Sequence, residues 1–214
     1  MKDIAIYGAG GFGREIACLI NQINSHTATW NLIGFFDDGK EIGLEVSHFG
    51  KVLGGIEQLN DWRQEISVVI AIGNPNAVRA ISQNIVNPAV DFPNIIHPSF
   101  FLSDAETFSI GKGNIIQGRC VVSCDVAIGD FNVFNGSVVV GHDVVIGSYN
   151  TFMPAVRVSG EVKIGECNFF GISSIVLQQL KIGNNVKLGA GSVLMTKPKD
   201  DVLYMGNPAK RFKY

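Results

Sequence analysis

An apolar residue recurs at every sixth position through the C-terminal half of the chain. Stepping by six from Ile110, the residue is Ile, Val, Phe or Leu at all 15 positions up to Leu194. Isoleucine–glycine pairs mark every third step, at positions 110, 128, 146, 164 and 182. With 46% hydrophobic residues in the chain, chance would fill a chosen frame on the order of once in a hundred thousand trials.

A period of six matches neither the 3.6-residue period of an α-helix nor the two-residue alternation of a flat sheet. It indicates a parallel β-helix in which one residue in six points inward. Three hexapeptides then close a triangular coil, and five such coils stack with each burying its apolar corners against its neighbours. We interpret the glycines after the inward isoleucines as corner residues that let the backbone turn tightly.

The N-terminal half follows a different pattern, in which strand-like and helix-like segments alternate. Residues 4–10, 31–38 and 66–74 are predicted strands, and residues 13–23 and 78–85 are predicted helices. This order predicts a parallel sheet with helical crossovers, a Rossmann-like α/β domain. We place this domain at residues 1–95 and the β-helix at 96–214, with the proline-containing segment 87–99 as the linker.

Charge and cysteine usage exclude several classes of function. A net charge of −2 argues against a nucleic-acid-binding surface. The four cysteines show neither metal-site spacing with histidine nor a disulfide pattern, which predicts free thiols in the cytoplasm and no metal site. Because no apolar run approaches about 18 residues, we expect no membrane span.

A glycine-rich turn follows the first predicted strand. Gly8, Gly10, Gly11 and Gly13 stand between this strand and the next helix, where backbone N–H groups can hold a phosphate. Two carboxylates, Asp37 and Asp38, end the second strand, where a dinucleotide fold would contact a ribose. A nicotinamide cofactor is the alternative interpretation, but the domain is short and lacks a second mononucleotide-binding half.

Several motifs together carry a family resemblance: the isoleucine–glycine array, "GHD" at 141–143, "GNPAKRF" at 206–212, "IYGAGGFGRE" at 6–15 and "GFFDD" at 34–38. With them the chain resembles the left-handed β-helix acetyltransferases of the PglD, NeuD and perosamine N-acetyltransferase type. The resemblance implies a Rossmann-like domain followed by a left-handed parallel β-helix. It also implies a homotrimer that binds acetyl-CoA between adjacent β-helices and a nucleotide-sugar on the N-terminal domain.

His142 is the candidate general base. It stands two residues after the inward Val140, so its side chain is expected to project from the coil. A surface histidine without a chemical role is the alternative. In the resembling family a histidine followed by an acidic residue, usually glutamate, occupies this place. Asp143 is one methylene shorter, so its contact with the imidazole remains open.

The resemblance also implies the residues that bind the two substrates. Those expected to bind the nucleotide-sugar are Gly8, Gly10, Gly11, Phe12, Gly13, Asp37, Asp38, Gly73, Asn74 and Arg79, with Phe12 replacing a histidine found in many members. Those expected to bind the coenzyme are Thr151, Gly160, Gly171, Ile172, Gly189, Ala190, Lys197, Pro208 and Lys210. Thr151 replaces a second histidine of the family, which leaves oxyanion stabilisation to backbone N–H groups such as that of Gly160. For Arg79 and the lysines, a solvated surface charge is the alternative.

Three functions follow from these features. The first is acetyl-CoA-dependent acetylation of the amine of a nucleotide-linked amino sugar in bacterial surface-glycan biosynthesis. The second is O-acetylation of a sugar of the sialic acid type. The third is a non-catalytic, trimeric nucleotide-binding scaffold, which would need neither His142 nor the C-terminal coenzyme motif.

Overall fold

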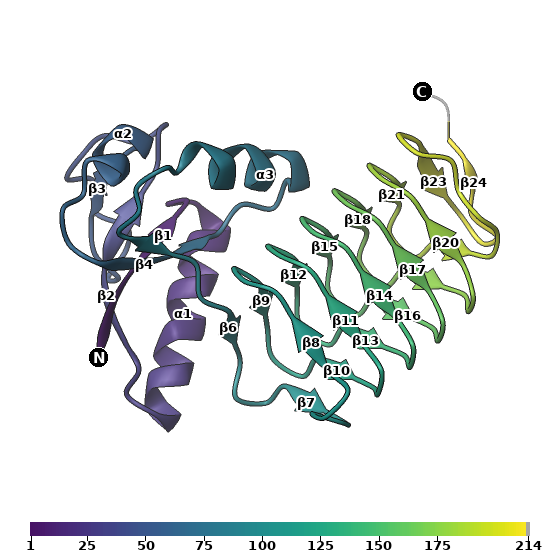
Figure 1. Ribbon diagram of the computed structural model, residues 1–214. Coiled ribbons are helices and arrows are strands. Elements are labelled where there is room, and N and C mark those ends of the chain that lie inside the picture. Colours follow the sequence, from purple (N-terminus) through teal and green to yellow (C-terminus); the bar gives the residue numbers. More distant parts are fainter. Residues whose placement is uncertain (213–214) are drawn as a thin grey trace. The chain divides into compact units, whose positions relative to one another are not determined.

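The computed structural model describes residues 1–212 of the 214-residue chain. The chain divides into two compact units between Pro98 and Ser99, an α/β unit followed by a β-helix (Figure 1). Within the described residues, no helix has the length and apolarity needed to cross a bilayer.

The N-terminal unit contains a five-stranded parallel sheet in the order β3-β2-β1-β4-β5. The strands are β1 (Lys2–Tyr7), β2 (Trp30–Phe36), β3 (Val52–Gly54), β4 (Ile66–Ile70) and β5 (Val90–Asp91), and the helices are α1 (Gly11–His26), α2 (Ile56–Asn60) and α3 (Pro75–Asn84). All five residues of β4 are buried, as expected of a central parallel strand. The predicted Rossmann-like half is confirmed, although the sequence patterns missed β3, α2 and β5.

Helix α3 begins at Pro75, three residues before the predicted start at Val78. Asn74 is its N-cap, since the Asn74 side chain accepts a hydrogen bond from the backbone N–H of Ala77 at 3.2 Å. Proline fits the first helical position because its missing N–H has no intrahelical partner there. The predicted helix is confirmed, but it starts earlier because a capping residue and a proline set its first turn.

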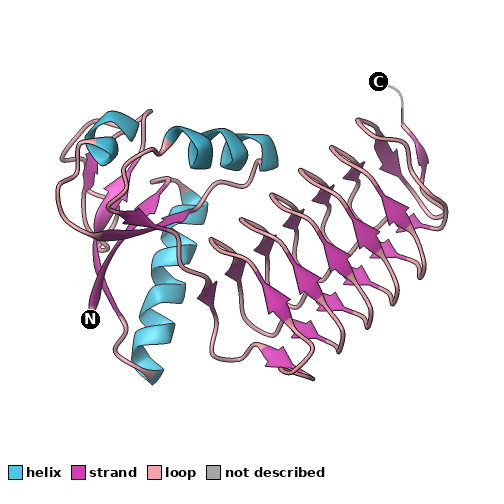
Figure 2. Cartoon of the chain, viewed as in Figure 1, coloured by secondary structure: helices cyan, strands magenta, loops and turns pink. Residues whose placement is uncertain are grey.

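The C-terminal unit is a parallel β-helix with three faces, consistent with the left-handed form (Figure 2). Strand β6 (Ile95–Ile96) precedes the division at Pro98. The first face of the C-terminal unit contains β9 (Ile115–Ile116), β12 (Val133–Phe134), β15 (Thr151–Phe152), β18 (Phe169–Phe170), β21 (Lys187–Leu188), β23 (Leu203–Met205) and the antiparallel β24 (Lys210–Arg211). The second contains β7 (Phe101–Leu102), β10 (Val121–Val122), β13 (Val139–Val140), β16 (Arg157–Val158), β19 (Ile175–Val176) and β22 (Val193–Leu194). The third contains β8 (Ser109–Ile110), β11 (Ala127–Ile128), β14 (Val145–Ile146), β17 (Lys163–Ile164) and β20 (Lys181–Ile182).

The strand register reproduces the sequence repeat. From β8 to β22, paired strands are 18 residues apart, as Val139 is from Arg157, whereas Phe101 of β7 pairs with Val121 and Lys187 of β21 pairs with Leu203 of β23. The second face has six strands, so the array starts one rung earlier than the predicted five coils. The segment 87–99, predicted as a linker, contains β5 and β6. The prolines of this segment therefore do not prevent short strands from forming between them.

The inward positions form the core of the β-helix. Every inward residue from Ile116 to Leu194 is buried, and Ile110 at the start is partly exposed. Three of these residues stack as a column of aromatic rings, since the centroids of Phe134 and Phe152 and those of Phe152 and Phe170 are both 4.7 Å apart. The predicted inward pattern is thus confirmed, and the rings are offset by one coil each.

The glycines after the inward isoleucines have a different role from the predicted one. Gly129, Gly147 and Gly165 do not adopt the left-handed conformation of a tight turn. A Cβ atom on Gly147 would instead lie 2.6 Å from the carbonyl oxygen of Gly165 in the next coil. These positions need glycine because neighbouring backbones approach closely, so the prediction of a turn-forming role was wrong.

The left-handed turn residues lie elsewhere and are not glycines. From Arg119 to Asn185, every sixth residue has a φ between 54° and 65°, and Asp143 is one of them, at 57°. These positions hold arginine, aspartate, phenylalanine, serine, tyrosine and other residue types. Because a left-handed conformation disfavours most of these residues, hydrogen bonding and packing between coils must hold them there.

A ladder of buried asparagines links successive coils and was missed in the sequence. Asn114, Asn132, Asn150 and Asn168 are all fully buried, 18 residues apart. The Oδ1 atom of each accepts from the backbone N–H one coil later, for example Asn168 N–H to Asn150 Oδ1 at 2.9 Å. The Nδ2 group of Asn150 donates to the Gly165 carbonyl at 2.9 Å. The ladder satisfies backbone groups that would otherwise be buried without partners.

The hydroxyl of Ser174 is buried and has no hydrogen-bond partner among residues 1–212. The preceding coils place Val138 and Val156 at equivalent positions. We therefore expect Ser174→Val to raise the free energy of unfolding by about 1 kcal/mol, because an unpaired buried hydroxyl is removed.

The matched control for this prediction is Ser192→Val, one coil later. The Ser192 Oγ atom accepts from the Gly206 N–H at 2.9 Å, so this variant should lose stability. Chemical denaturation of both variants provides the measurement. Equal losses in the two would contradict the assignment of Ser174 as unpaired.

Candidate active site

His142 lies in the turn between β13 and β14, on the outside of the coil. Val140 points inward with 1% exposure, whereas the side chains of His142 and Asp143 are 55% and 58% exposed. The His142 Nδ1 atom lies 2.7 Å from Asp143 Oδ2. The shorter aspartate carboxylate therefore reaches the imidazole, which answers the question left open by the sequence.

This contact gives the two ring nitrogens different surroundings. An Nδ1–H group that donates to the carboxylate leaves Nε2 as the nitrogen able to accept a proton. The carboxylate also stabilises the imidazolium that forms when the ring takes up a proton. The pair is therefore chemically suited to general base catalysis.

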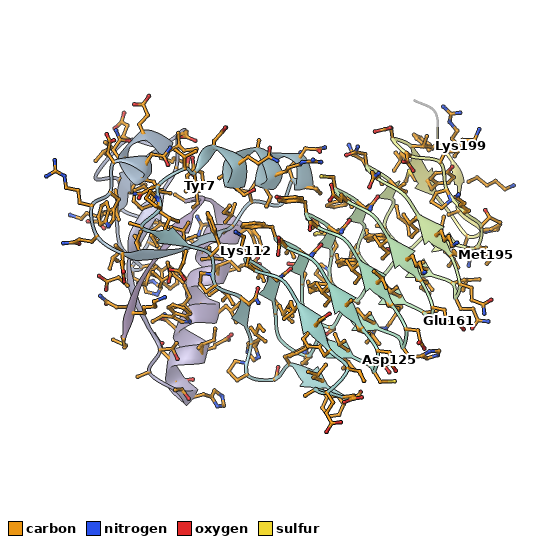
Figure 3. The ribbon with its side chains drawn as sticks, viewed as in Figure 1. Tyr7, Lys112, Asp125, Glu161, Met195 and Lys199 are labelled. Atoms are coloured by element: carbon orange, nitrogen blue, oxygen red, sulfur yellow. The ribbon has the colours of Figure 1, made fainter. Side chains whose placement is uncertain are left out.

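A groove of about 480 Å³ adjoins this turn. It is lined by Asp125, Asp143, Val145, Glu161 and Lys163. Asp125 and Glu161 lie along the same edge of the β-helix, one coil before and one coil after Asp143 (Figure 3). Sequence reasoning missed Asp125, Glu161 and Lys163, although steps of 18 from Asp143 reach the first two.

The predicted coenzyme residues fall on different parts of the β-helix. Gly160 lies in the turn after β16, one coil beyond His142. Thr151 is on β15 of the first face, half a coil from His142, and is 2% exposed. Two further turns, between the first and second faces, contain Gly171, Ile172, Gly189 and Ala190. A single chain therefore does not bring Thr151 and His142 together.

The predicted cations and Pro208 lie after β22. Lys197, Pro208 and Lys210 are exposed. A hollow of about 260 Å³ in this part of the chain is lined by Asn185, Lys187, Asp201, Val202, Leu203, Arg211 and Phe212. Lys187 had been missed because an outward lysine in a strand has no distinctive sequence signal.

The glycine-rich turn joins β1 to α1, as predicted. A Cβ atom on Gly8 would lie 2.7 Å from the Ala71 carbonyl oxygen, and one on Gly13 would lie 1.9 Å from that of Gly8. A Cβ on Gly10 or Gly73 would meet nothing within 4 Å. Gly8 and Gly13 are thus required because neighbouring atoms leave no room for a side chain, whereas Gly10 and Gly73 border open space. The nearest atom to a Cβ on Gly11 is an Arg14 nitrogen at 4.0 Å.

The two carboxylates at the end of β2 bind backbone and side-chain groups of the same unit. Asp37 accepts hydrogen bonds from the Ala9 N–H at 2.8 Å and the Gly39 N–H at 2.9 Å. Asp38 accepts from the Ile56 N–H at 2.8 Å and from the Tyr7 hydroxyl. Both also line a hollow of about 350 Å³, together with Lys40, Ile42, Gly55, Ile56, Glu57 and Gln58. They connect the glycine turn to the start of α2.

The other residues predicted to bind the sugar lie at the start of α3, along α3 and in the first turn of α1. Asn74 caps α3 with its side-chain oxygen. Arg79 is exposed on α3, and Phe12 is partly exposed in the first turn of α1. The cap accounts for Asn74 in structural terms, so any contact with a ligand would fall to its amide N–H₂ group.

Burial, and after it the hydrogen bond to Asp38, raises the pKa of Tyr7 above its usual value of 10.0. An unfolded chain would ionise this tyrosine near pH 10, whereas the folded chain keeps the proton. The contribution of Tyr7 is therefore fully present below pH 10 and is lost as pH rises above it. We expect the advantage in unfolding free energy of the parent over Tyr7→Phe to shrink above pH 10.

Guanidinium denaturation of both proteins between pH 7 and 11 measures this difference. At pH 7, Tyr7→Phe should be about 1–2 kcal/mol less stable, because Asp38 loses a donor. A difference that stays constant over the whole pH range would contradict the raised pKa.

Comparisons with known proteins agree with this architecture. Residues 3–85 match the family model described as the PglD N-terminal domain. No curated protein matches the chain. The chain is similar to the acetyltransferase domain of PglB from Neisseria gonorrhoeae FA1090 in complex with acetyl coenzyme A, with 28% identity, 99% of each chain covered and a TM-score of 0.87.

Two other solved structures are similar over the whole chain. PerB from Caulobacter crescentus, in complex with CoA and GDP-perosamine, is 26% identical, with 100% of this chain and 98% of that chain covered and a TM-score of 0.87. WeeI from Acinetobacter baumannii AYE is 25% identical, with 99% of this chain and 100% of that chain covered and a TM-score of 0.88. Both domains of the predicted fold are therefore present in these proteins in the same order.

Proposed function

We propose that this protein is an acetyl-CoA-dependent acetyltransferase that acts on the amine of a nucleotide-linked amino sugar. The observation that carries the proposal is the outward His142–Asp143 pair on a β-helix that matches sugar acetyltransferases over its whole length. The complex of PerB with CoA and GDP-perosamine favours an amino-sugar acceptor. Acetylation of such a sugar would serve bacterial surface-glycan biosynthesis.

In the proposed mechanism, Nε2 of His142 takes a proton from the acceptor nitrogen as that nitrogen attacks the thioester carbonyl. A C–N bond forms, and the negative charge of the tetrahedral intermediate rests on the carbonyl oxygen. The C–S bond then breaks, and the imidazolium returns its proton to the departing thiolate. Asp143 stabilises the imidazolium between these two steps.

The two units divide the substrates between them in this proposal. Residues 1–95 would hold the nucleotide-sugar, with Gly10, Gly11 and Gly73 next to its phosphates, where they border open space. Residues 96–214 would hold acetyl-CoA along the turns that contain Gly171, Ile172, Gly189 and Ala190. The other residues that the sequence analysis assigns to binding of the nucleotide-sugar or of the coenzyme keep those binding roles in this proposal. The free thiols of the four cysteines support a cytoplasmic location.

The outward residues of the second face support assembly as a homotrimer. They form a column of apolar side chains on successive strands, namely Phe101, Val121, Val139, Ile175 and Val193, interrupted by Arg157. None of the five is fully buried in the single chain. A second copy of the chain would cover this column.

Release of thiol from acetyl-CoA tests the proposed function. The protein is assayed with UDP-, GDP- and CMP-linked amino sugars and with the matched sugars that carry a hydroxyl in place of the amine. We expect release with at least one amino sugar and none with its hydroxyl counterpart. Release with hydroxyl sugars alone would overturn the choice of amine, and no release with any acceptor would overturn the proposal.

A further inference from the structure

Gly160 is the only glycine among four equivalent positions along one edge of the β-helix. The other three, at steps of 18, are Cys124, His142 and Gln178. The backbone is alike at three of these positions, because the residue after His142, Gly160 or Gln178 repeats the same bond to the previous coil: Asp143 N–H to Cys124 O at 3.2 Å, Glu161 N–H to His142 O at 2.8 Å and Gln179 N–H to Gly160 O at 3.0 Å. Gly160 does not have a positive φ. The backbone conformation therefore does not require glycine here.

The imidazole of His142 occupies the space that a side chain at residue 160 would fill. A Cβ atom on Gly160 would lie 2.6 Å from His142 Nε2, 2.7 Å from Cε1 and 3.1 Å from Cδ2. The first two distances are shorter than real contacts allow, so the ring would have to move. The ring is also held on its other side, since Nδ1 is 2.7 Å from Asp143 Oδ2.

We infer that Gly160 is a positioning residue. Because it has no side chain, it leaves the space that the His142 ring occupies, here called the seat of the ring, and keeps Nε2 free to take up a proton. The Cβ of any other residue would meet the ring at the Nε2–Cε1 edge. Displacing the ring from this seat would also strain its hydrogen bond to Asp143. The inference rests on the proposed function for its effect on catalysis, but the seat itself is a property of the free protein.

This role differs from donation of the Gly160 N–H to an oxyanion. Alanine at position 160 keeps the N–H group and adds only the Cβ atom. If Gly160 acts solely through its N–H, Gly160→Ala should retain most of the activity. If it seats the imidazole, the same variant should lose turnover to nearly the extent that loss of His142 does.

A double-mutant cycle separates an effect through His142 from an independent one. We expect Gly160→Ala to lower kcat about 100-fold, to leave KM for acetyl-CoA within about threefold, and to have no further effect in a His142→Ala background. An equal loss in both backgrounds, or near-normal turnover in the single variant, would overturn the inference. Gly136→Ala is the matched control, since the nearest atom to a Cβ there is the Gly118 carbonyl oxygen at an ordinary 3.5 Å.

Nuclear magnetic resonance of ¹⁵N-labelled histidine tests the seat without any substrate. The His142 ring signals are assigned by their disappearance in His142→Ala. We expect them to shift in Gly160→Ala and to stay unchanged in Gly136→Ala, with both variants folded. Unchanged His142 signals in Gly160→Ala would overturn the inference even if the protein is an active acetyltransferase. A shift in a protein that releases no thiol would uphold the seat while the proposed function fails.

Discussion

His142→Ala is expected to lower turnover by about 100-fold or more, with the fold intact. The variant lacks the imidazole that takes the acceptor's proton and returns it to the thiolate. Because the side chain is 55% exposed, its removal leaves no core cavity. The measurement is thiol release at saturating acetyl-CoA and acceptor, with thermal unfolding as the test of folding.

His26→Ala is the matched control for this prediction. This exposed histidine lies in the last turn of α1, and its loss should leave turnover unchanged. Asp143→Asn should give an intermediate loss, because an amide still contacts the ring but cannot stabilise an imidazolium as a carboxylate does. Near-normal turnover of His142→Ala would remove this residue from the mechanism.

Phe152→Ala is expected to lower the free energy of unfolding by about 3–5 kcal/mol. The Phe152 ring is fully buried between those of Phe134 and Phe170, with 4.7 Å between centroids on each side. Neighbouring coils cannot close the gap, because their backbone spacing is fixed by parallel strand pairing. Chemical denaturation at a fixed protein concentration gives the difference.

Phe152→Leu serves as the control, since it fills most of the same volume. Its expected loss is about 1 kcal/mol. If Phe152→Ala were no less stable than Phe152→Leu, the stacked rings could not be a main source of stability in the β-helix.

The β-helix could be predicted from sequence because its inward residues are apolar at a fixed interval. The chemical nature of the turn residues offered no such signal, since residues as different as Arg119, Phe131 and Asp143 share the left-handed conformation. The glycines were visible, but their role depends on the distance to the next coil. The asparagine ladder was detectable, because four asparagines recur at the same interval as the isoleucines.

Some features of the candidate site could likewise be predicted from sequence, and others could not. His142 and Asp143 could be found because they are polar residues in an apolar repeat. The seat at Gly160 required the position of the ring relative to the following coil. The hydrogen bonds of Asp38 to the Tyr7 hydroxyl and the Ile56 N–H depend on three separate segments meeting at one end of the sheet. No local sequence pattern indicates that these three segments lie next to one another.

The constant strand offset of the β-helix restricts how such a protein can change in length. Between β8 and β22, each strand pairs with residues 18 positions further along, for example Ala127 with Val145. Inserting or deleting one residue within a strand would turn every later inward side chain to the outside, whereas a duplicated whole coil would keep the register. Homologous chains should therefore differ in size by whole coils or by loops that bulge from the corners.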